Sequence, residues 1–206
     1  MCKSTAHPGL HKPQKQMAFL SKTATAAITQ KSGGAYLSPS KIADGGSARF
    51  ALLSEEPLEF WETWGQDSAG SMKPFRFPQE PTPEEVVLEL GSYTPRTKDN
   101  GGLDIKFAIA VPVYHFEDGK VKVLQLTQKS IISELDQVAQ MEDYENLQEW
   151  DFILSRTGSK LTTVYTLRPA PRKTTTNKVI EAAWSETRAA GFDITRLLTG
   201  GDPFKA

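Results

Sequence analysis

The sequence predicts a mainly β protein built on a small five-stranded Greek-key barrel, with two or three helices and flexible termini. From residue 47 onward, short stretches alternate apolar and polar residues and are interrupted by Pro and Gly, as in antiparallel strands. Their order is a meander, then a helix, then a closing hairpin, which is the order of that barrel. A β-sandwich or a different small barrel stays open as an alternative.

Alternation predicts strands at 47–54, 58–65, 73–77, 104–116, 120–127, 150–156 and 161–168. Two pairs of these strands should form hairpins, through residues 117–119 and through residues 157–160. Each connection contains a Gly that can adopt the positive φ a tight reversal needs.

Three helices are predicted. Thr82 followed by Pro83 and two Glu residues is a helix start signal, and that helix should end at Gly91. A second helix should cover 129–141 and pack an apolar stripe on the sheet, formed by Ile131, Ile132, Leu135, Val138 and Ala139. A third amphipathic helix is expected at 177–190, with no prediction of where it packs.

Composition divides the chain into three parts. Residues 1–41 contain six Lys and neither Asp nor Glu, which predicts a flexible basic arm. Residues 46–173 should form the barrel, and residues 174–206 a C-terminal helix and tail.

Composition and motifs also exclude several classes. One cysteine excludes an internal disulfide and a thiolate zinc site, so no metal or other cofactor is expected. Apolar runs are too short to span a bilayer, and no secretory signal is visible, which predicts a soluble cytoplasmic protein. Phosphate-binding Gly loops, a nucleophile elbow and paired metal-ligating His are lacking, so the chain is not expected to be an enzyme.

Charge is segregated although the formal net charge is only −1. Residues 130–151 carry seven acids and no base, whereas residues 152–180 carry six bases and no acid. This pattern favours one positive side able to attract phosphate. The alternative, equally supported, is a solvated hairpin whose charges pair with the nearby helix.

Cations and aromatic rings occur together in the predicted strands, as a site for unpaired nucleic-acid bases requires. Phe60 and Trp61 point to opposite faces of one strand, so at least one ring should lie outside the core. The same alternation places Lys106 and Tyr114 on a polar face, while Phe50, Phe107 and Phe152 suit the core. The candidate nucleic-acid-binding residues are Arg49, Phe60, Trp61, Trp64, Lys73, Phe75, Arg76, Phe77, Lys106, Tyr114, Lys120, Lys122, Arg156, Lys160, Tyr165 and Arg168.

Four ordered segments carry a family resemblance: 48–64 (ARFALLSEEPLEFWETW), 74–91 (PFRFPQEPTPEEVVLELG), 119–135 (GKVKVLQLTQKSIISEL) and 151–173 (DFILSRTGSKLTTVYTLRPAPRK). Together they resemble the replication-type single-stranded DNA-binding proteins of tailed bacteriophages. The resemblance implies an oligonucleotide-binding (OB) fold and sequence-tolerant binding of single-stranded DNA during replication, recombination or repair. It also implies replication or recombination proteins as partners and the host cytoplasm as the location, and it leaves self-association on DNA open.

The chain departs from that family at two points. It has no equivalent of the zinc-binding subdomain that some members carry, and its end, 199–206, is not a long acidic tail. Two other functions stay open: single-stranded RNA binding, and a protein-interaction or virion structural module on a small barrel.

Overall fold

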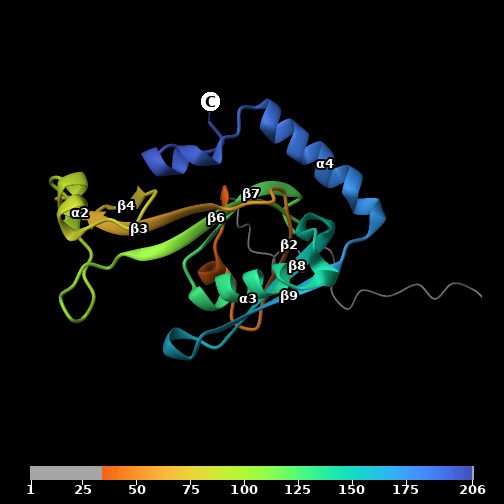
Figure 1. The fold of residues 1–206 in the computed structure, drawn as a ribbon, viewed down its shortest axis with the longest axis horizontal. Helices are drawn as coiled ribbons and strands as arrows, with labels where there is room; N and C mark the ends of the chain where they lie inside the picture. The colour runs from red at the N-terminus through yellow and green to blue at the C-terminus, as the bar shows by residue number, and fades with distance from the viewer. Residues whose placement is uncertain (1–33, 206) are drawn as a thin grey trace, which may run out of the picture. The chain divides into compact units, whose positions relative to one another are not determined.

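A single mixed β-sheet organises the part of the chain that the computed structural model describes, residues 34–205 (Figure 1). Its nine strands in that range are β1 (Tyr36–Leu37), β2 (Ser47–Leu52), β3 (Leu58–Gln66), β4 (Met72–Phe77), β5 (Thr94–Pro95), β6 (Lys106–His115), β7 (Lys120–Leu126), β8 (Trp150–Thr157) and β9 (Val164–Pro171). The α-helices are α2 (Pro83–Leu90), α3 (Lys129–Ala139) and α4 (Thr174–Ala189). Short 3₁₀ turns are η1 (Pro39–Lys41), η2 (Glu142–Tyr144), η3 (Leu147–Glu149), η4 (Lys160–Thr162) and η5 (Ile194–Thr199).

Both predicted hairpins are confirmed. β6 pairs antiparallel with β7, and Gly119 in the turn has φ 63°. β8 pairs antiparallel with β9, and Gly158 after β8 has φ 78°. The seven predicted strands and three predicted helices all occur, with ends shifted by a few residues.

β6 is the centre of the sheet. One of its edges pairs with β7, and the other pairs with β3 along its first half and with β2 along its second half. The chain leaves the sheet at 53–57, between β2 and β3, and β2 also pairs with β8. The sheet therefore divides at this bend into a β3–β4 wing and a β2–β8–β9 wing.

The predicted closed barrel is not what the structure shows, because the sheet stays open. Within residues 34–205, β7 has only the two-residue β1 on its free edge, and β9 pairs with β8 alone. Helix α3 contacts both β7 and β9, and a carboxylate oxygen of Glu134 accepts a hydrogen bond from the Leu167 backbone N–H at 2.6 Å. A side chain of α3 thus accepts the hydrogen bond of a backbone N–H that a closing strand would need as its donor.

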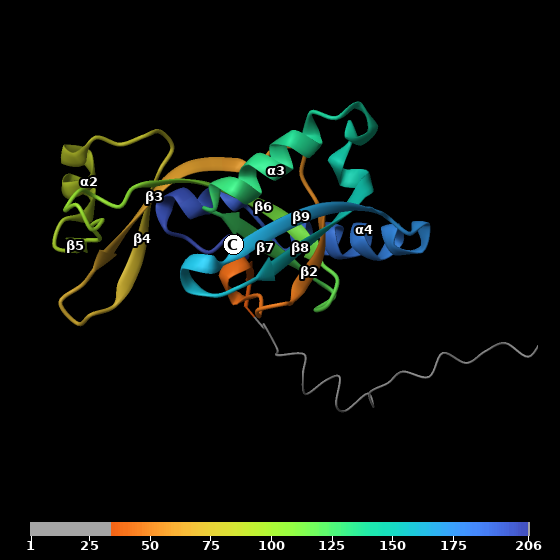
Figure 2. The ribbon, with the colours of Figure 1, turned by 90° about the horizontal axis from the view of Figure 1, so that it is seen from below.

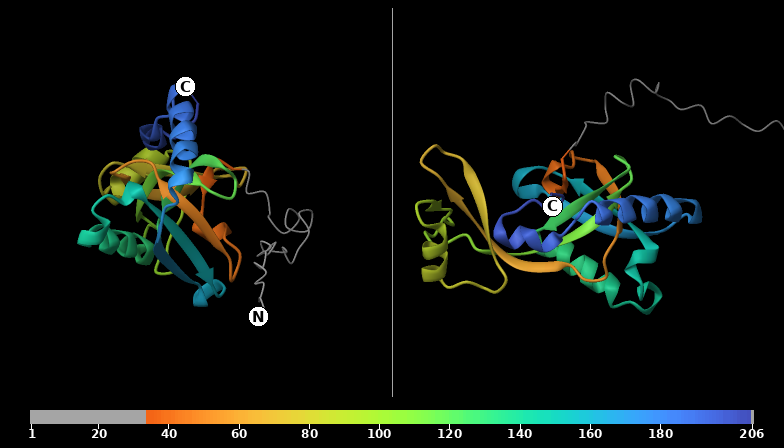
Figure 3. Two further views of the ribbon diagram at one scale, coloured as in Figure 1. Left: turned by 90° about the vertical axis from the view of Figure 1, so that its right-hand side faces the viewer. Right: turned by 90° about the horizontal axis from the view of Figure 1, so that it is seen from above.

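The two faces of the sheet are covered by different segments. On the inner face, α3 packs Ile131 and Val138 onto a core that includes Phe50 and Phe152 (Figures 1 and 2). On the outer face, α4 buries Ile180, and η5 buries Leu197 against Phe60 (Figures 1 and 3). Residues 174–205 therefore form part of the same packed unit as the strands.

The β3–β4 wing has a small core of its own. Thr82 caps α2 in a reciprocal arrangement with Glu85, as the start signal predicts. Phe75 packs with Val86 and Leu90 of that helix. A Cβ at Gly65 would lie 2.8 Å from the Tyr93 Cβ, so only Gly allows this close approach.

The predicted basic arm falls mostly on residues 1–33, which lie outside the described residues. Residues 34–41, also assigned to the arm, contain β1 and η1, and β1 pairs parallel with β7. Among residues 34–205, no helix is long and apolar enough to cross a membrane, and no three His, Cys, Asp or Glu side chains are grouped to hold a metal ion.

Candidate nucleic-acid interface

A cleft of about 600 Å³ lies on the outer face of the sheet, and we call it the polar cleft. It is lined by the segment 36–41, with β1 and η1, by residues of β3, β4 and β7, by Thr127 and Gln128, by Arg96, Asp104 and Lys106, and by Gly200 and Gly201 after η5. The polar cleft therefore brings together segments that are far apart in the sequence.

A hydrogen-bond network centred on the buried Glu62 borders the polar cleft. The two carboxylate oxygens accept bonds from Trp64 Nε1 at 3.0 Å, Gln125 Nε2 at 2.8 Å and Arg76 Nε at 3.1 Å. Arg76 also donates to Gln125 Oε1 at 3.2 Å and to the Leu197 carbonyl at 3.2 Å. The side chains of Arg76 and Glu62 are only 8% and 5% exposed. This network fixes the orientation of the Trp64 ring, because the indole N–H has a defined partner.

Two aromatic rings line the polar cleft, Trp64 from β3 and Tyr36 from β1. Trp64 is half-buried, and Tyr36 is 36% exposed. Burial raises the pKa of the Tyr36 phenol, so the hydroxyl stays protonated and uncharged at neutral pH. Both rings have accessible surface on which a flat base could stack.

Cations outnumber carboxylates along the polar cleft. The lining holds four basic side chains, Lys41, Arg76, Arg96 and Lys106, and two acids, Glu62 and Asp104, an excess of two positive charges. Arg76 and Glu62 are buried and pair with each other, so the exposed cations are Lys41, Arg96 and Lys106. A positive cleft of this kind attracts a phosphate backbone locally, even on a chain of near-zero net charge.

A second hollow, of about 690 Å³, lies on the inner face, and we call it the apolar groove. Trp61 and Phe107 line it with their rings edge to face, 5.7 Å between centroids, and α3 forms its other side through Ile132 and Leu135. Its lining holds one basic residue, Lys129, and three acids, Glu55, Glu59 and Asp136, an excess of two negative charges. A negative rim repels phosphate, so the apolar groove is unsuited to nucleic acid.

Three of the predicted site residues line the polar cleft: Trp64, Arg76 and Lys106. Trp61 lies in the apolar groove instead. Lys73 is exposed on β4, with its Nζ 5.0 Å from the centre of the Phe75 ring. The structure thus brings together only a minority of the sixteen candidates.

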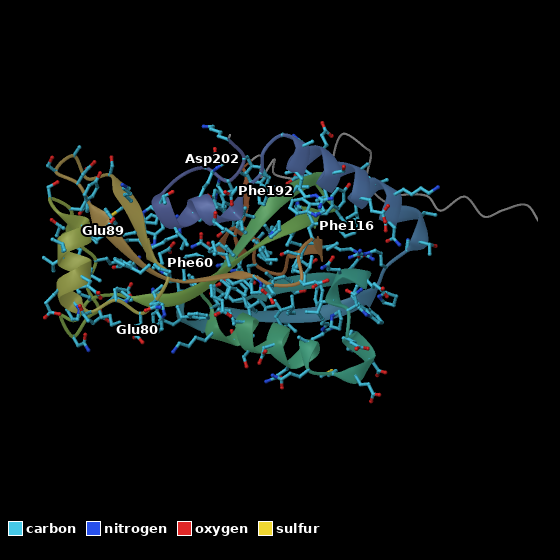
Figure 4. All side chains as sticks on the ribbon, turned by 45° about the horizontal axis from the view of Figure 1, so that its top comes forward. Phe60, Glu80, Glu89, Phe116, Phe192 and Asp202 are labelled. Atoms are coloured by element: carbon cyan, nitrogen blue, oxygen red, sulfur yellow. The ribbon has the colours of Figure 1, made fainter. Side chains whose placement is uncertain are left out.

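Four candidates are buried, which corrects their assignment as accessible contacts. Phe60 packs under η5, and Phe75 packs under α2. Tyr114 is 6% exposed beneath α4, so its predicted place on a polar, solvent-facing side is wrong. Lys122 is buried and forms an ion pair with Asp118. Figure 4 shows Phe60 on the strand that η5 covers, with Phe192 above it.

Two further candidates have structural partners. Arg49 forms an ion pair with the buried Asp151 at 2.6 Å, and Arg172 reaches the same carboxylate at 2.8 Å. Arg156 donates to the carbonyls of Ser40 and Ile42, both at 2.8 Å. Part of the basic stretch 152–180 therefore holds the fold together, through partners that do not lie on α3.

The remaining candidates lie outside the polar cleft. Phe77 packs partly in the core of the β3–β4 wing, and Lys120 is exposed at the β6–β7 turn. Lys160, Tyr165 and Arg168 belong to the β8–β9 hairpin, where both cations are exposed and Tyr165 packs partly on the main core.

The cleft residues absent from the predicted set include Tyr36, Lys41, Arg96 and Gln125, together with the acids Glu62 and Asp104. Tyr36 and Lys41 lie in the segment that composition assigned to the arm. Gln125 had a usable signal, since alternation in 120–126 places it opposite Leu124 and Leu126 on the outer face.

Comparison of the chain with models of known protein families, with curated proteins and with solved structures found no match.

Proposed function

We propose that this chain binds single-stranded DNA with little sequence preference, and that the strand lies in the polar cleft. The observation that supports this most is the combination of two accessible rings, Tyr36 and Trp64, with three exposed cations, Lys41, Arg96 and Lys106, in one hollow. Stacking of a base on an aromatic ring contributes about 1–3 kcal/mol and tolerates any base. A duplex hides its base faces, so the rings favour unpaired DNA.

The connection of the strands supports the same proposal. If β2 and β3 are taken as one interrupted strand, the order β2/β3, β6, β7, α3, β8, β9 is that of the OB barrel, with the helix before the last hairpin. In that fold, oligonucleotides bind across the second and third strands, which here would be β6 and β7. Lys106 of β6 and Gln125 of β7 line the polar cleft, whereas α4 and η5 cover the rest of that face, so the strand would meet only this end of β6 and β7. We propose an open variant of this fold, with residues 67–105 as a long insertion between its first and second strands.

The resemblance of segments 48–64, 74–91, 119–135 and 151–173 to phage single-stranded DNA-binding proteins suggests the biological setting. We propose that the chain protects exposed DNA during phage replication, recombination or repair, next to the enzymes of those processes. It would then work in the cytoplasm of the host cell.

Titration of a fluorescein-labelled oligo-dT with the full-length chain tests the proposal. We expect anisotropy to rise, tryptophan emission to be quenched and affinity to fall steeply with added salt, since phosphate contacts release counterions. The same oligonucleotide in a duplex should bind far more weakly. Equal affinity for duplex and single strand would contradict the stacking model.

Two alternatives give different results in the same assay. A matched oligo-U that competes as well as oligo-dT would favour RNA, because stacking and backbone charge do not by themselves sense the 2′-hydroxyl. Lack of binding to either strand would favour a protein-interaction module. The apolar groove, with Trp61 and Phe107 beneath an acidic rim, would then be the surface to examine.

A further inference from the structure

Two cations at the mouth of the polar cleft share one carboxylate. Arg96 Nε lies 3.3 Å from Asp104 Oδ2, and Lys106 Nζ lies 3.1 Å from the same oxygen. The side chains of Arg96 and Lys106 are 57% and 51% exposed, whereas that of Asp104 is 11% exposed. Both cations are therefore open to solvent, whereas the carboxylate that they share is nearly buried.

Backbone hydrogen bonds hold this arrangement beside Trp64. The Arg96 N–H donates to the Trp64 carbonyl at 2.7 Å, and the Asp104 N–H donates to the Arg96 carbonyl at 2.9 Å. Lys106 lies opposite Glu62 in the β3–β6 ladder, two residues from Trp64. The backbone positions of Arg96 and Lys106 relative to Trp64 are therefore set by the sheet.

A carboxylate oxygen bridging two cations occupies the place that a phosphate oxygen would take. Arg and Lys both bind carboxylates and phosphates through the same charge-assisted hydrogen bonds. Arg96 and Lys106 are exposed enough to turn from Asp104 to a phosphate, but a carboxylate that is only 11% exposed loses its partners at a cost, and this cost opposes binding.

We propose that Arg96 and Lys106 form a subsite for one backbone phosphate of single-stranded nucleic acid, and that Asp104 occupies this subsite in the free chain. The inference rests on the proposed function, which it deepens. When a strand binds, its phosphate takes both cations next to the base that stacks on Trp64, and Asp104 is left without them. Asp104 therefore limits affinity, and its charge is the specific obstacle.

Substitution of Asp104 by Asn tests the subsite in the full-length chain, with anisotropy of labelled oligo-dT as readout. Asp99→Asn is the matched control, since Asp99 is exposed in the adjacent turn and has no ion pair in the described part of the chain. Both variants change net charge equally. We expect Asp104→Asn to raise affinity about 3-fold to 10-fold and Asp99→Asn to raise it less than about 2-fold.

A second background shows whether the gain acts through the two cations. In the Arg96→Gln, Lys106→Gln double variant, binding should fall about 10-fold, and adding Asp104→Asn should no longer raise it. A gain that persists there would mean that Asp104 acts through the overall field of the protein, and would overturn the subsite.

The outcomes separate the subsite from the proposed function. If the wild-type chain fails to bind oligo-dT, the function is wrong and the subsite with it. If the wild-type chain binds but Asp104→Asn binds no better than Asp99→Asn, only the subsite is wrong. If Asp104→Asn does not fold, the single variants Arg96→Gln and Lys106→Gln test the subsite instead. Each should weaken oligo-dT binding about 3-fold or more, and unchanged binding in either variant would overturn the subsite.

Discussion

Trp61 and Trp64 are three residues apart on β3 and face different environments. Trp64 lies in the polar cleft on the outer face, where cations exceed acids by two. Trp61 lies in the apolar groove on the inner face, where acids exceed cations by two. Two similar side chains on one strand are thus separated by the alternation of the strand and by the charges that other segments bring to each face.

The difference shows that a ring beside a cation in the sequence is weak evidence for a nucleic-acid site. Arg49 and Phe50 are neighbours, but Arg49 pairs with Asp151 and Phe50 stacks on Phe152 in the core. In the polar cleft, by contrast, the exposed cations that share the lining with Trp64 come from η1, β6 and the residue after β5, which are distant from Trp64 in the sequence.

The largest difference should be between Glu62 and Glu59, which lie on opposite faces of β3. Glu62→Ala removes the centre of the buried network and leaves Arg76 without its carboxylate, which should lower the free energy of unfolding by about 3–5 kcal/mol. Glu59→Ala, at the exposed rim of the apolar groove, should change it by less than about 0.5 kcal/mol. Urea unfolding measures both, and equal effects would contradict the described network.

Next in size is the effect of the two tryptophans on DNA binding. Trp64→Ala should weaken binding of oligo-dT by about 1–3 kcal/mol, because one base loses its stacking partner. Trp61→Ala should leave the affinity nearly unchanged. Anisotropy measures the affinities, and circular dichroism checks that both variants fold. A larger loss of affinity with Trp61→Ala would place the strand on the inner face.

A third region, the β6–β7 turn, should affect the stability of the fold without affecting DNA binding. Partial burial tends to raise the pKa of Asp118, but hydrogen bonds from Lys122 and His115 outweigh it and hold the pKa below its ordinary value of 3.8. A lowered folded-state pKa contributes stability above the unfolded-state pKa, and this is lost as pH falls through the folded-state value. Asp118→Asn should therefore cost about 1–2 kcal/mol at pH 7 and less below about pH 4.

Urea unfolding at neutral and acid pH measures this change, and oligo-dT titration provides the comparison. Affinity should be unchanged in Asp118→Asn, since Asp118 lines neither hollow. A stability loss that is the same at both pH values would show that the charge of Asp118 does not act through His115 and Lys122.

The smallest effect should come from exposed lysines at the two hollows. Lys41→Gln, at the polar cleft, should lower the slope of log affinity against log salt by about 0.7, as expected for one phosphate contact on a single strand. Lys129→Gln, at the apolar groove, makes the same charge change and should leave the slope as it is. Equal slopes for the two variants would show that Lys41, and with it η1, does not contact the DNA.

Local patterns predicted most of the elements because strands and helices depend on alternation, turn residues and caps. The β6–β7 hairpin with Gly119 and the α2 cap at Thr82 are examples. Closure of the sheet was not predictable in this way. It depends on whether β9 meets β7, and Glu134 of α3 instead accepts the bond from Leu167.

The site was predicted less well, because exposure depends on what later segments cover. Alternation placed Tyr114 on the face opposite Val111 and Val113, and nothing local shows that α4 buries that face. Lys106 is on the same face and stays exposed, because the polar cleft opens there. Tyr36 was missed because a basic, acid-free composition hides a two-residue strand.

Photo-cross-linking of oligo-dT to the full-length chain, with the attached residues identified by mass spectrometry, tests the central claim most directly. The proposed binding mode predicts cross-links at Trp64 and Tyr36, which lie on different strands but in one cleft. Cross-links confined to Trp61 and Phe107, or to the β8–β9 hairpin, would contradict it.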